Sequence, residues 1–90
     1  MNKAEFIDRV ATKANISKRE AADVFSTITD VITETLKAGD SITFVGFGKF
    51  ETRLRKAKVA RNPQTGAQIN IPAKRVPAFK PGSALKEAIK

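Results

Sequence analysis

The chain has 90 residues, of which 17 are lysine or arginine and 9 are aspartate or glutamate, so its net charge is +8. It contains no cysteine, histidine, tryptophan or tyrosine, which excludes disulfide bonds, thiolate and imidazole catalysis and the common zinc sites. A chain this short predicts one domain over residues 1–90. The lack of a long apolar run predicts a soluble, cytoplasmic protein without a membrane partner. The positive charge favours a polyanionic partner, with nucleic acid first and an anionic membrane surface a distant second.

Two helices are predicted in the first part of the chain, over residues 3–14 and 18–38. Residues suited to helix ends flank both of them: Asn2 and Ser17 as N-caps, each with a glutamate three residues later, and Asn15 and Gly39 as closing residues. The second helix would be roughly 31 Å long at 1.5 Å per residue. The shorter first helix cannot cover the apolar stripe along it, so residues 1–38 are the expected dimerisation region.

Strands and a final helix are predicted in the rest of the chain. The expected strands are residues 41–44, 49–55, 67–71 and 76–79, and a short helix follows over residues 83–90 with Ser83 as its N-cap. Glycines on both sides of Phe47 make a tight connection that leaves its ring free to project. Large apolar residues alternate along the second strand only as far as Leu54. The chain is therefore expected to leave the globular body from about Arg55 onward.

The positive charge lies in one segment, residues 49–80. This segment holds nine basic residues and one acid, Glu51, and so accounts for the whole net charge of +8. A turn signal with Pro63 in its second place, residues 62–66, divides the segment into two runs typical of strands. The segment therefore predicts a basic two-stranded ribbon with a proline at its tip.

The expected loop fixes a strand register. If residues 62–66 form the loop, Val59 lies opposite Ile69 and Arg53 opposite Arg75, unless a bulge at Pro72 shifts the lower part by one residue. Directly opposed like charges destabilise a hairpin. Two interpretations of this pair remain open. A phosphate binds between Arg53 and Arg75, or both side chains simply extend into water.

The apolar core is small for a domain without a disulfide bond or a metal, which leaves oligomerisation as the means of stabilisation. A symmetric dimer is the commonest solution. The residues expected at its core are Phe44, Phe47, Phe50 and Phe79 of the sheet and Ile28, Val31 and Ile32 of the second helix.

Pro63 allows two interpretations. Proline often presets φ at the second position of a turn, or an apolar ring at the tip of a basic ribbon can enter the minor groove and part a base step. Ten extended residues, 53–62, span roughly 33 Å, about one turn of duplex DNA. An isolated hairpin is marginal in water, so the arm is expected to be mobile in the free protein.

Several stretches of the sequence closely resemble the bacterial histone-like HU family: Met1–Lys3, Gly46–Phe50, Arg61–Gly66, Ile71–Ala73 and Val76–Gly82. The resemblance extends over essentially the full length. It implies an α+β fold that forms an intertwined dimer. In this fold two N-terminal helices make a helical base, and a three-stranded antiparallel sheet at 41–80 carries a protruding β-ribbon arm at about 53–76. A short C-terminal helix completes the chain.

The resemblance also implies roles for individual residues. Pro63 matches the intercalating proline of the family. The other residues expected to bind DNA are Arg53, Arg55, Lys58, Arg61, Asn62, Lys74 and Arg75 of the arm, and Lys3 and Lys80 of the body. Ser83 departs from the family, because many members carry a lysine there, and this weakens the expected contact with flanking DNA.

We therefore expect a histone-like architectural protein that binds double-stranded DNA in the minor groove, largely without sequence specificity. It would bend the DNA, prefer bent, nicked or distorted duplexes, and compact and protect DNA in the bacterial nucleoid. We expect no cofactor and no enzymatic activity, since no nucleophile has a base beside it. Two alternatives remain open: the sequence-specific integration host factor, which usually pairs two different subunits, and a structural dimer that binds RNA or acidic proteins.

Overall fold

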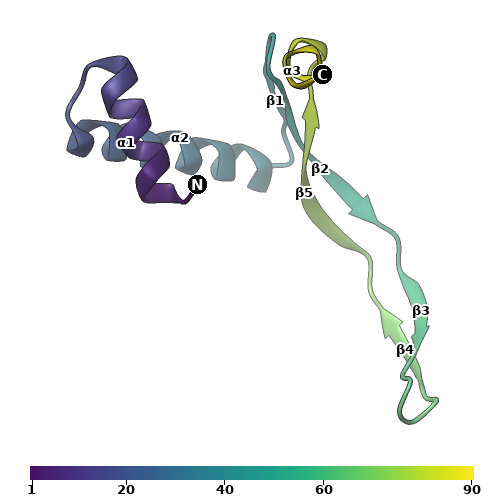
Figure 1. The fold of residues 1–90 in the computed structure, drawn as a ribbon. Coiled ribbons are helices and arrows are strands. Elements are labelled where there is room, and N and C mark those ends of the chain that lie inside the picture. The colour runs from purple at the N-terminus through teal and green to yellow at the C-terminus, as the bar shows by residue number, and fades with distance from the viewer. The chain divides into compact units, whose positions relative to one another are not determined.

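The computed structural model describes all residues from Met1 to Lys90. Contacts divide the chain into two compact units, Met1–Glu34 and Thr35–Lys90. The first unit contains α1 (Lys3–Ala14) and most of α2 (Lys18–Lys37). The second contains β1 (Ile42–Phe44), β2 (Gly48–Arg55), β3 (Lys58–Arg61), β4 (Gln68–Ile71), β5 (Lys74–Pro81) and α3 (Ser83–Ile89), as Figure 1 shows.

Local hydrogen bonds set the ends of the first two helices, as the sequence predicts. The Asn2 side chain accepts a hydrogen bond from the Glu5 amide at 2.9 Å. The Ser17 hydroxyl accepts one from the Glu20 amide and donates one to the Glu20 carboxylate, both at 3.0 Å. Asn15 closes α1 with φ 57°, in the left-handed region. These contacts lie within a few residues of one another, which is why the sequence alone predicts both helices.

The end of α2 is closed by glycine. Gly39 has φ +82°, its amide donates to the Leu36 carbonyl at 3.0 Å, and the Asp40 amide donates to the Thr35 carbonyl at 3.1 Å. This pair of bonds is the Schellman arrangement, in which a residue with positive φ satisfies the last carbonyls of a helix. The helix itself ends at Lys37, one residue before the predicted end.

The helical unit buries little apolar surface. The rings of Phe6 and Phe25 lie 5.4 Å apart between α1 and α2, and the buried side chains are the small ones of Ala11 and Ala21. A stripe along α2 at helical spacing stays about half exposed: Val24 53%, Ile28 48% and Val31 51%. The predicted excess of apolar surface on α2 is therefore present in the single chain.

A three-stranded antiparallel sheet in the order β1-β2-β5 forms the body of the second unit. Four phenylalanine rings of this unit pack one against the next in a row. The Phe44 centroid lies 6.0 Å from that of Phe50, the Phe50 centroid 4.9 Å from that of Phe79, and the Phe79 centroid 5.5 Å from that of Phe47. None of these rings is fully buried, and Phe44, Phe47 and Phe79 remain 40–48% exposed.

Phe47 is held at its backbone, while its ring contacts one neighbour and stays about half exposed. Its amide donates to the Phe44 carbonyl at 2.9 Å, and its carbonyl accepts from the Gly82 amide at 2.8 Å. Gly46, at φ +84°, supplies the left-handed residue of this turn. The backbone of residue 47 is thus held on both sides, and its ring packs on Phe79.

The β3–β4 ribbon continues the line of β2 and β5 away from β1 and α3 (Figure 1). The ladder is interrupted between its two parts, because no pairing joins Lys56 and Ala57 to Pro72 and Ala73. Pro72 has no amide hydrogen to donate. Two residues are skipped on each strand, so the interruption leaves the register unchanged and there is no bulge of one residue.

The predicted register is wrong by one residue throughout. The structure places Val59 opposite Asn70 and Arg53 opposite Val76. The cause lies at the tip, where the Asn62 amide donates to the Ala67 carbonyl at 2.9 Å. Asn62 therefore belongs to the paired strand, and the loop begins one residue later than the turn signal suggests. The opposed like charges are Arg55 with Lys74 and Lys49 with Lys80, rather than Arg53 with Arg75.

Helix α3 begins at Ser83, and its N-cap is Gly82 rather than the predicted Ser83. The Gly82 carbonyl accepts the first helical hydrogen bond, from the Lys86 amide at 3.1 Å. Gly82 makes no side-chain cap, and its backbone instead joins the turn at Phe47 through its amide. The glycine therefore connects β5 to the helix and to the β1–β2 turn.

We expect Gly48→Ala to destabilise the protein more than Gly46→Ala. A Cβ at residue 48 would stand 2.6 Å from the Phe79 ring and 2.8 Å from the Lys80 carbonyl oxygen, and such overpacking costs about 3 kcal/mol. A Cβ at residue 46 meets nothing within 4 Å, so that variant carries only the left-handed penalty of about 1 kcal/mol. Urea unfolding measures both, and equal losses would contradict the packing at Gly48.

Candidate nucleic-acid interface

Charge is divided unevenly between the two units. Residues 35–90 hold 12 basic and 3 acidic side chains, a surplus of 12 − 3 = +9, and residues 1–34 hold 5 basic and 6 acidic ones, a balance of 5 − 6 = −1. Most of the surplus lies on β2–β5 and the ribbon beyond it. A polyanion is therefore attracted to the unit that carries the arm.

The observed register puts most of the predicted contacts of β2–β5 on one face. Side chains directly opposite each other in an antiparallel pair lie on the same side of the sheet, and alternate residues along a strand share that side. One face therefore carries every cation of the two strands except Arg75: Lys49, Arg53 and Arg55 from β2, and Lys74 and Lys80 from β5. We call these five residues the basic face. The opposite face carries Phe50 with Phe79 and Leu54 with Arg75.

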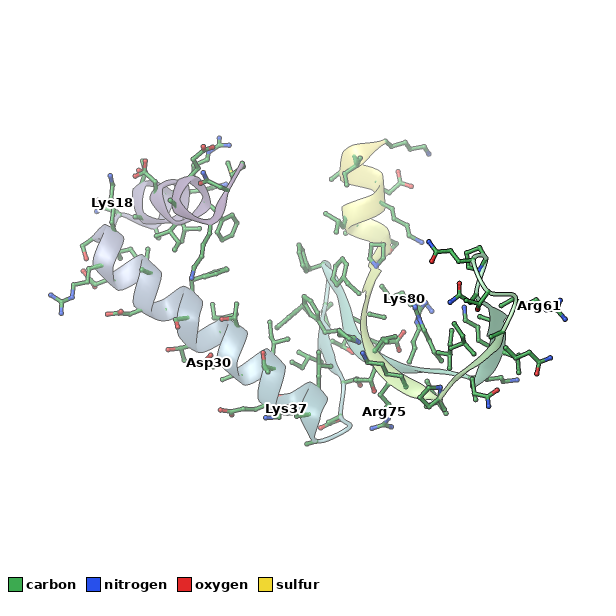
Figure 2. The ribbon with its side chains drawn as sticks, turned by 90° about the horizontal axis from the view of Figure 1, so that it is seen from below. Lys18, Asp30, Lys37, Arg61, Arg75 and Lys80 are labelled. Carbon is green, nitrogen blue, oxygen red and sulfur yellow. The ribbon has the colours of Figure 1, made fainter.

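Arg75 is the predicted contact that does not join the basic face. Its guanidinium lies over the turn after α2, with Nη1 2.9 Å from the point where a Cβ of Gly39 would stand. Figure 2 shows Arg75, Lys80 and Arg61 at separate places along the strands and the ribbon. Arg75 is exposed beside this turn, on the face opposite the other cations of β2 and β5.

The tip of the ribbon is a self-contained turn. The Gly66 amide donates to the Asn62 carbonyl at 2.8 Å, and Gly66 has φ +71°. The Asn62 side-chain oxygen accepts from the Gln64 amide at 2.9 Å, and the Thr65 hydroxyl accepts from the Ala67 amide at 3.3 Å. Asn62, a predicted DNA contact, therefore also holds the turn together. Pro63 lies next to it with its ring exposed.

A groove of about 610 Å³ lies where the ladder is interrupted. Four basic side chains line it, together with apolar ones, and no acidic residue does: Arg55, Lys56, Lys58 and Lys74 with Ile71, Pro72, Ala73 and Val76. Lys56 is not among the residues predicted to bind DNA. The groove brings Lys56 together with three residues that are predicted to bind DNA, Arg55, Lys58 and Lys74.

The two predicted contacts outside the arm have different surroundings. The Lys3 ammonium lies 5.8 Å from the centroid of the Phe25 ring, a cation–π contact. Lys80 lies opposite Lys49 on the basic face. Lys49 was not among the predicted contacts, although the alternation of β2 puts it on the same side as Arg53. The alternation was therefore the signal that could have identified it.

Charged side chains in the structure are placed near the surface. No group of three or more acidic side chains is arranged to hold a metal ion. No buried side-chain nitrogen or oxygen lacks a hydrogen-bond partner. None of the helices is long and apolar enough to cross a membrane.

Comparison with known proteins identifies the family. All residues from 1 to 90 match the family model described as bacterial DNA-binding protein. A DNA-binding protein HU of Geobacillus stearothermophilus is 51% identical over 90 residues, which is the whole of both chains. The chain belongs to the HU family of bacterial DNA-binding proteins. HU 1 of Bacillus subtilis strain 168 is 52% identical over 89 residues, covering 99% of this chain and 97% of the relative.

Solved structures support the same fold. The Anabaena HU–DNA cocrystal structure superposes with a TM-score of 0.93 at 46% identity, covering 99% of this chain and 97% of that one. A V42I mutant of HU from Thermotoga maritima gives a TM-score of 0.75 at 42% identity over the whole of both chains. The α+β fold expected from the sequence is therefore that of the HU family.

We expect the amides of the β3–β4 ribbon to exchange with solvent far faster than those of the sheet in the DNA-free protein. The ribbon is a two-stranded element whose residues are mostly exposed, and such hairpins are marginal in water. Val59 and Ile69 should exchange on the order of 100-fold faster than Phe50 and Phe79. Hydrogen exchange followed by NMR measures this, and slow exchange at Val59 and Ile69 without DNA would show a rigid arm.

Proposed function

We propose that this protein is an architectural DNA-binding dimer whose two arms clasp double-stranded DNA along the minor groove and bend it. The observation that carries the proposal is the β3–β4 ribbon itself. It has cations around a groove without an acid and an exposed proline at its tip. Positive charge without apolar support favours a binding partner that supplies negative charge. The DNA in the Anabaena cocrystal is consistent with this partner.

The proposed dimer follows from the apolar surface of the single chain. The half-exposed stripe of α2 and the chain of four phenylalanine rings need a cover, and a second copy of the chain supplies one of matching chemistry. The proposed dimer core is the predicted set: Ile28, Val31 and Ile32 with Phe44, Phe47, Phe50 and Phe79. In this view the two units of each chain act as one DNA-binding module, with residues 1–38 devoted to dimerisation.

In the proposed complex, different parts of the arm do different work. Arg53, Arg55, Lys58 and Lys74 bind phosphates along the strands and the groove, and Arg61 reaches the minor groove beside the tip. Lys3 and Lys80 contact flanking DNA. Arg75 would reach DNA from the opposite face of the sheet, beside the turn at Gly39. The minor groove offers a degenerate pattern of donors and acceptors, so recognition depends on groove width and deformability more than on base sequence.

Pro63 is proposed to part a base step. Its ring carries no donor and stands exposed beside Asn62, whose hydrogen bonds stiffen the turn. Apolar wedges of this kind kink DNA by roughly 20–90° at an unstacking cost of a few kcal/mol. Protein that bends DNA in this way, without choosing sequences, would compact and protect DNA in the bacterial nucleoid.

The salt dependence of DNA binding tests the electrostatic part of the proposal. If a dimer neutralises roughly 6–10 phosphates, the plot of log K against log salt should have a slope of about −5 to −9. Fluorescence anisotropy with a duplex of random sequence measures it. The same titration with A-form RNA and with an acidic peptide compares other polyanions. A flat plot, or RNA bound more tightly than DNA at every salt concentration, would contradict the proposed partner.

Replacing Pro63 with alanine separates bending from binding. A nicked duplex is already easy to kink, so P63A should lose little affinity for it. On an intact duplex the variant lacks the ring whose contacts offset the cost of unstacking a base step. The affinity of P63A for this duplex should therefore fall by roughly 10-fold, and the bend should be smaller. Gln64→Ala serves as the control, because it changes the neighbouring loop residue and keeps the ring of Pro63. Equal losses on intact and nicked duplexes would reject the wedge.

A further inference from the structure

Glu51 occupies an unusual place on the basic face. It is the one acidic residue between Asp40 and Glu87 in the sequence, and its strand position puts it between Lys49 and Arg53 on the same side of β2. Its Oε2 lies 3.7 Å from Lys49 Nζ, and its Oε1 lies 3.4 Å from Arg53 Nη2. Each carboxylate oxygen thus faces a different cation.

The exposure of the three side chains gives the arrangement a direction. The Glu51 side chain is 25% exposed, while those of Lys49 and Arg53 are 42% and 60% exposed. The carboxylate is therefore less accessible to solvent than the two cationic side chains, whose outer sides remain exposed. An approaching phosphate meets the cations first and the carboxylate behind them.

The two contacts are loose enough to be exchanged. Distances of 3.4 Å and 3.7 Å exceed those of tight charge-assisted hydrogen bonds, roughly 2.7–2.9 Å. Ion pairs between exposed groups also contribute little to stability. The carboxylate therefore does not lock the cations in place, although its negative charge opposes any phosphate that binds them.

We propose that Glu51 is an internal competitor of DNA phosphate: it masks Lys49 and Arg53 in the free protein and lowers the affinity of the basic face for DNA. The inference rests on the proposed DNA binding and adds to it a contact at Lys49 and a residue that limits affinity. When DNA phosphates bind Lys49 and Arg53, the Glu51 carboxylate loses both partners and attracts a salt cation from solution. This uptake offsets part of the release of counterions that drives binding.

The test compares Glu51→Gln with Glu87→Gln on an intact duplex near 0.15 M salt. Both changes remove one negative charge, but Glu87 lies on α3, where its exposed side chain pairs with Lys90 at 3.8 Å. Two surface pairs of typical strength predict that E51Q binds DNA roughly 2- to 30-fold more tightly than wild type for each basic face that contacts the duplex. E87Q should change affinity by less than about 2-fold, because Glu87 pairs with Lys90 of α3 and with no cation of the basic face, and exposed pairs of this kind contribute little.

The salt slope and a second substitution supply independent readouts. E51Q should have a slope steeper by about one per protomer, since the cation uptake is lost. Arg53→Gln should reduce affinity more in the E51Q background than in wild type, because only the unmasked arginine contributes fully. Circular dichroism of each variant checks that the fold is retained.

The outcomes separate the inference from the function on which it rests. If E51Q binds no more tightly than E87Q, the masking role is wrong. If E51Q binds more weakly than wild type, Glu51 positions the two cations for DNA rather than competing with it, which also overturns the inference. Failure of the wild-type protein to bind duplex DNA would instead reject the proposed function.

Discussion

The structure depends on a shortage of apolar burial in the single chain. Only the side chains of Ala11 and Ala21 are buried among the hydrophobic residues, and the phenylalanine rings of the sheet pack as a chain rather than inside a core. A domain of this size is marginal even when it buries its large side chains well. Without a disulfide bond or a metal, the remaining means of stabilisation is a second polypeptide. The proposed dimer is thus a consequence of packing as well as of family.

The shortage of apolar burial is greatest in the arm. Beyond Leu54 the strands have charge in place of apolar contacts, and the ladder is interrupted before it resumes as β3–β4. The tip keeps its shape through its own hydrogen bonds, whereas the strands behind it have little to pack against. We therefore expect the arm to gain most of its order from the molecule that it binds. In the proposed complex charge has two roles, attraction of DNA by the cations and moderation of that attraction by Glu51.

Much of this fold could be predicted from sequence, because its signals are local. The caps at Asn2 and Ser17 and the closures at Asn15 and Gly39 act within one turn of helix, and the alternation along β2 marks where the core ends. The basic segment and its turn signal indicated the arm. The small apolar core already indicated a dimer, and the family resemblance added its intertwined form and the roles of individual DNA-binding residues.

Other features depended on contacts that no local pattern reveals. The register was missed by one residue because Asn62 both pairs with Ala67 and accepts from Gln64, so that the paired strand extends into the turn signal. That shift decides the cross-strand neighbours of the basic side chains in β2, β3 and β5, including the isolation of Arg75 from the basic face. The anchoring of Phe47 by Gly82 likewise joins residues far apart in the sequence. Lys49 was accessible to the sequence analysis through strand alternation but was not identified.

The central claim is that two mobile arms of one dimer become ordered around a double helix. Because the chain has no cysteine, a Gln64→Cys variant carries a single spin label at the tip of each arm, and pulsed electron paramagnetic resonance measures the distance between two labels. We predict a broad distribution in the free protein that narrows when a nicked duplex is added at saturation. The absence of any coupling between labels, or a distribution unchanged by DNA, would contradict the account.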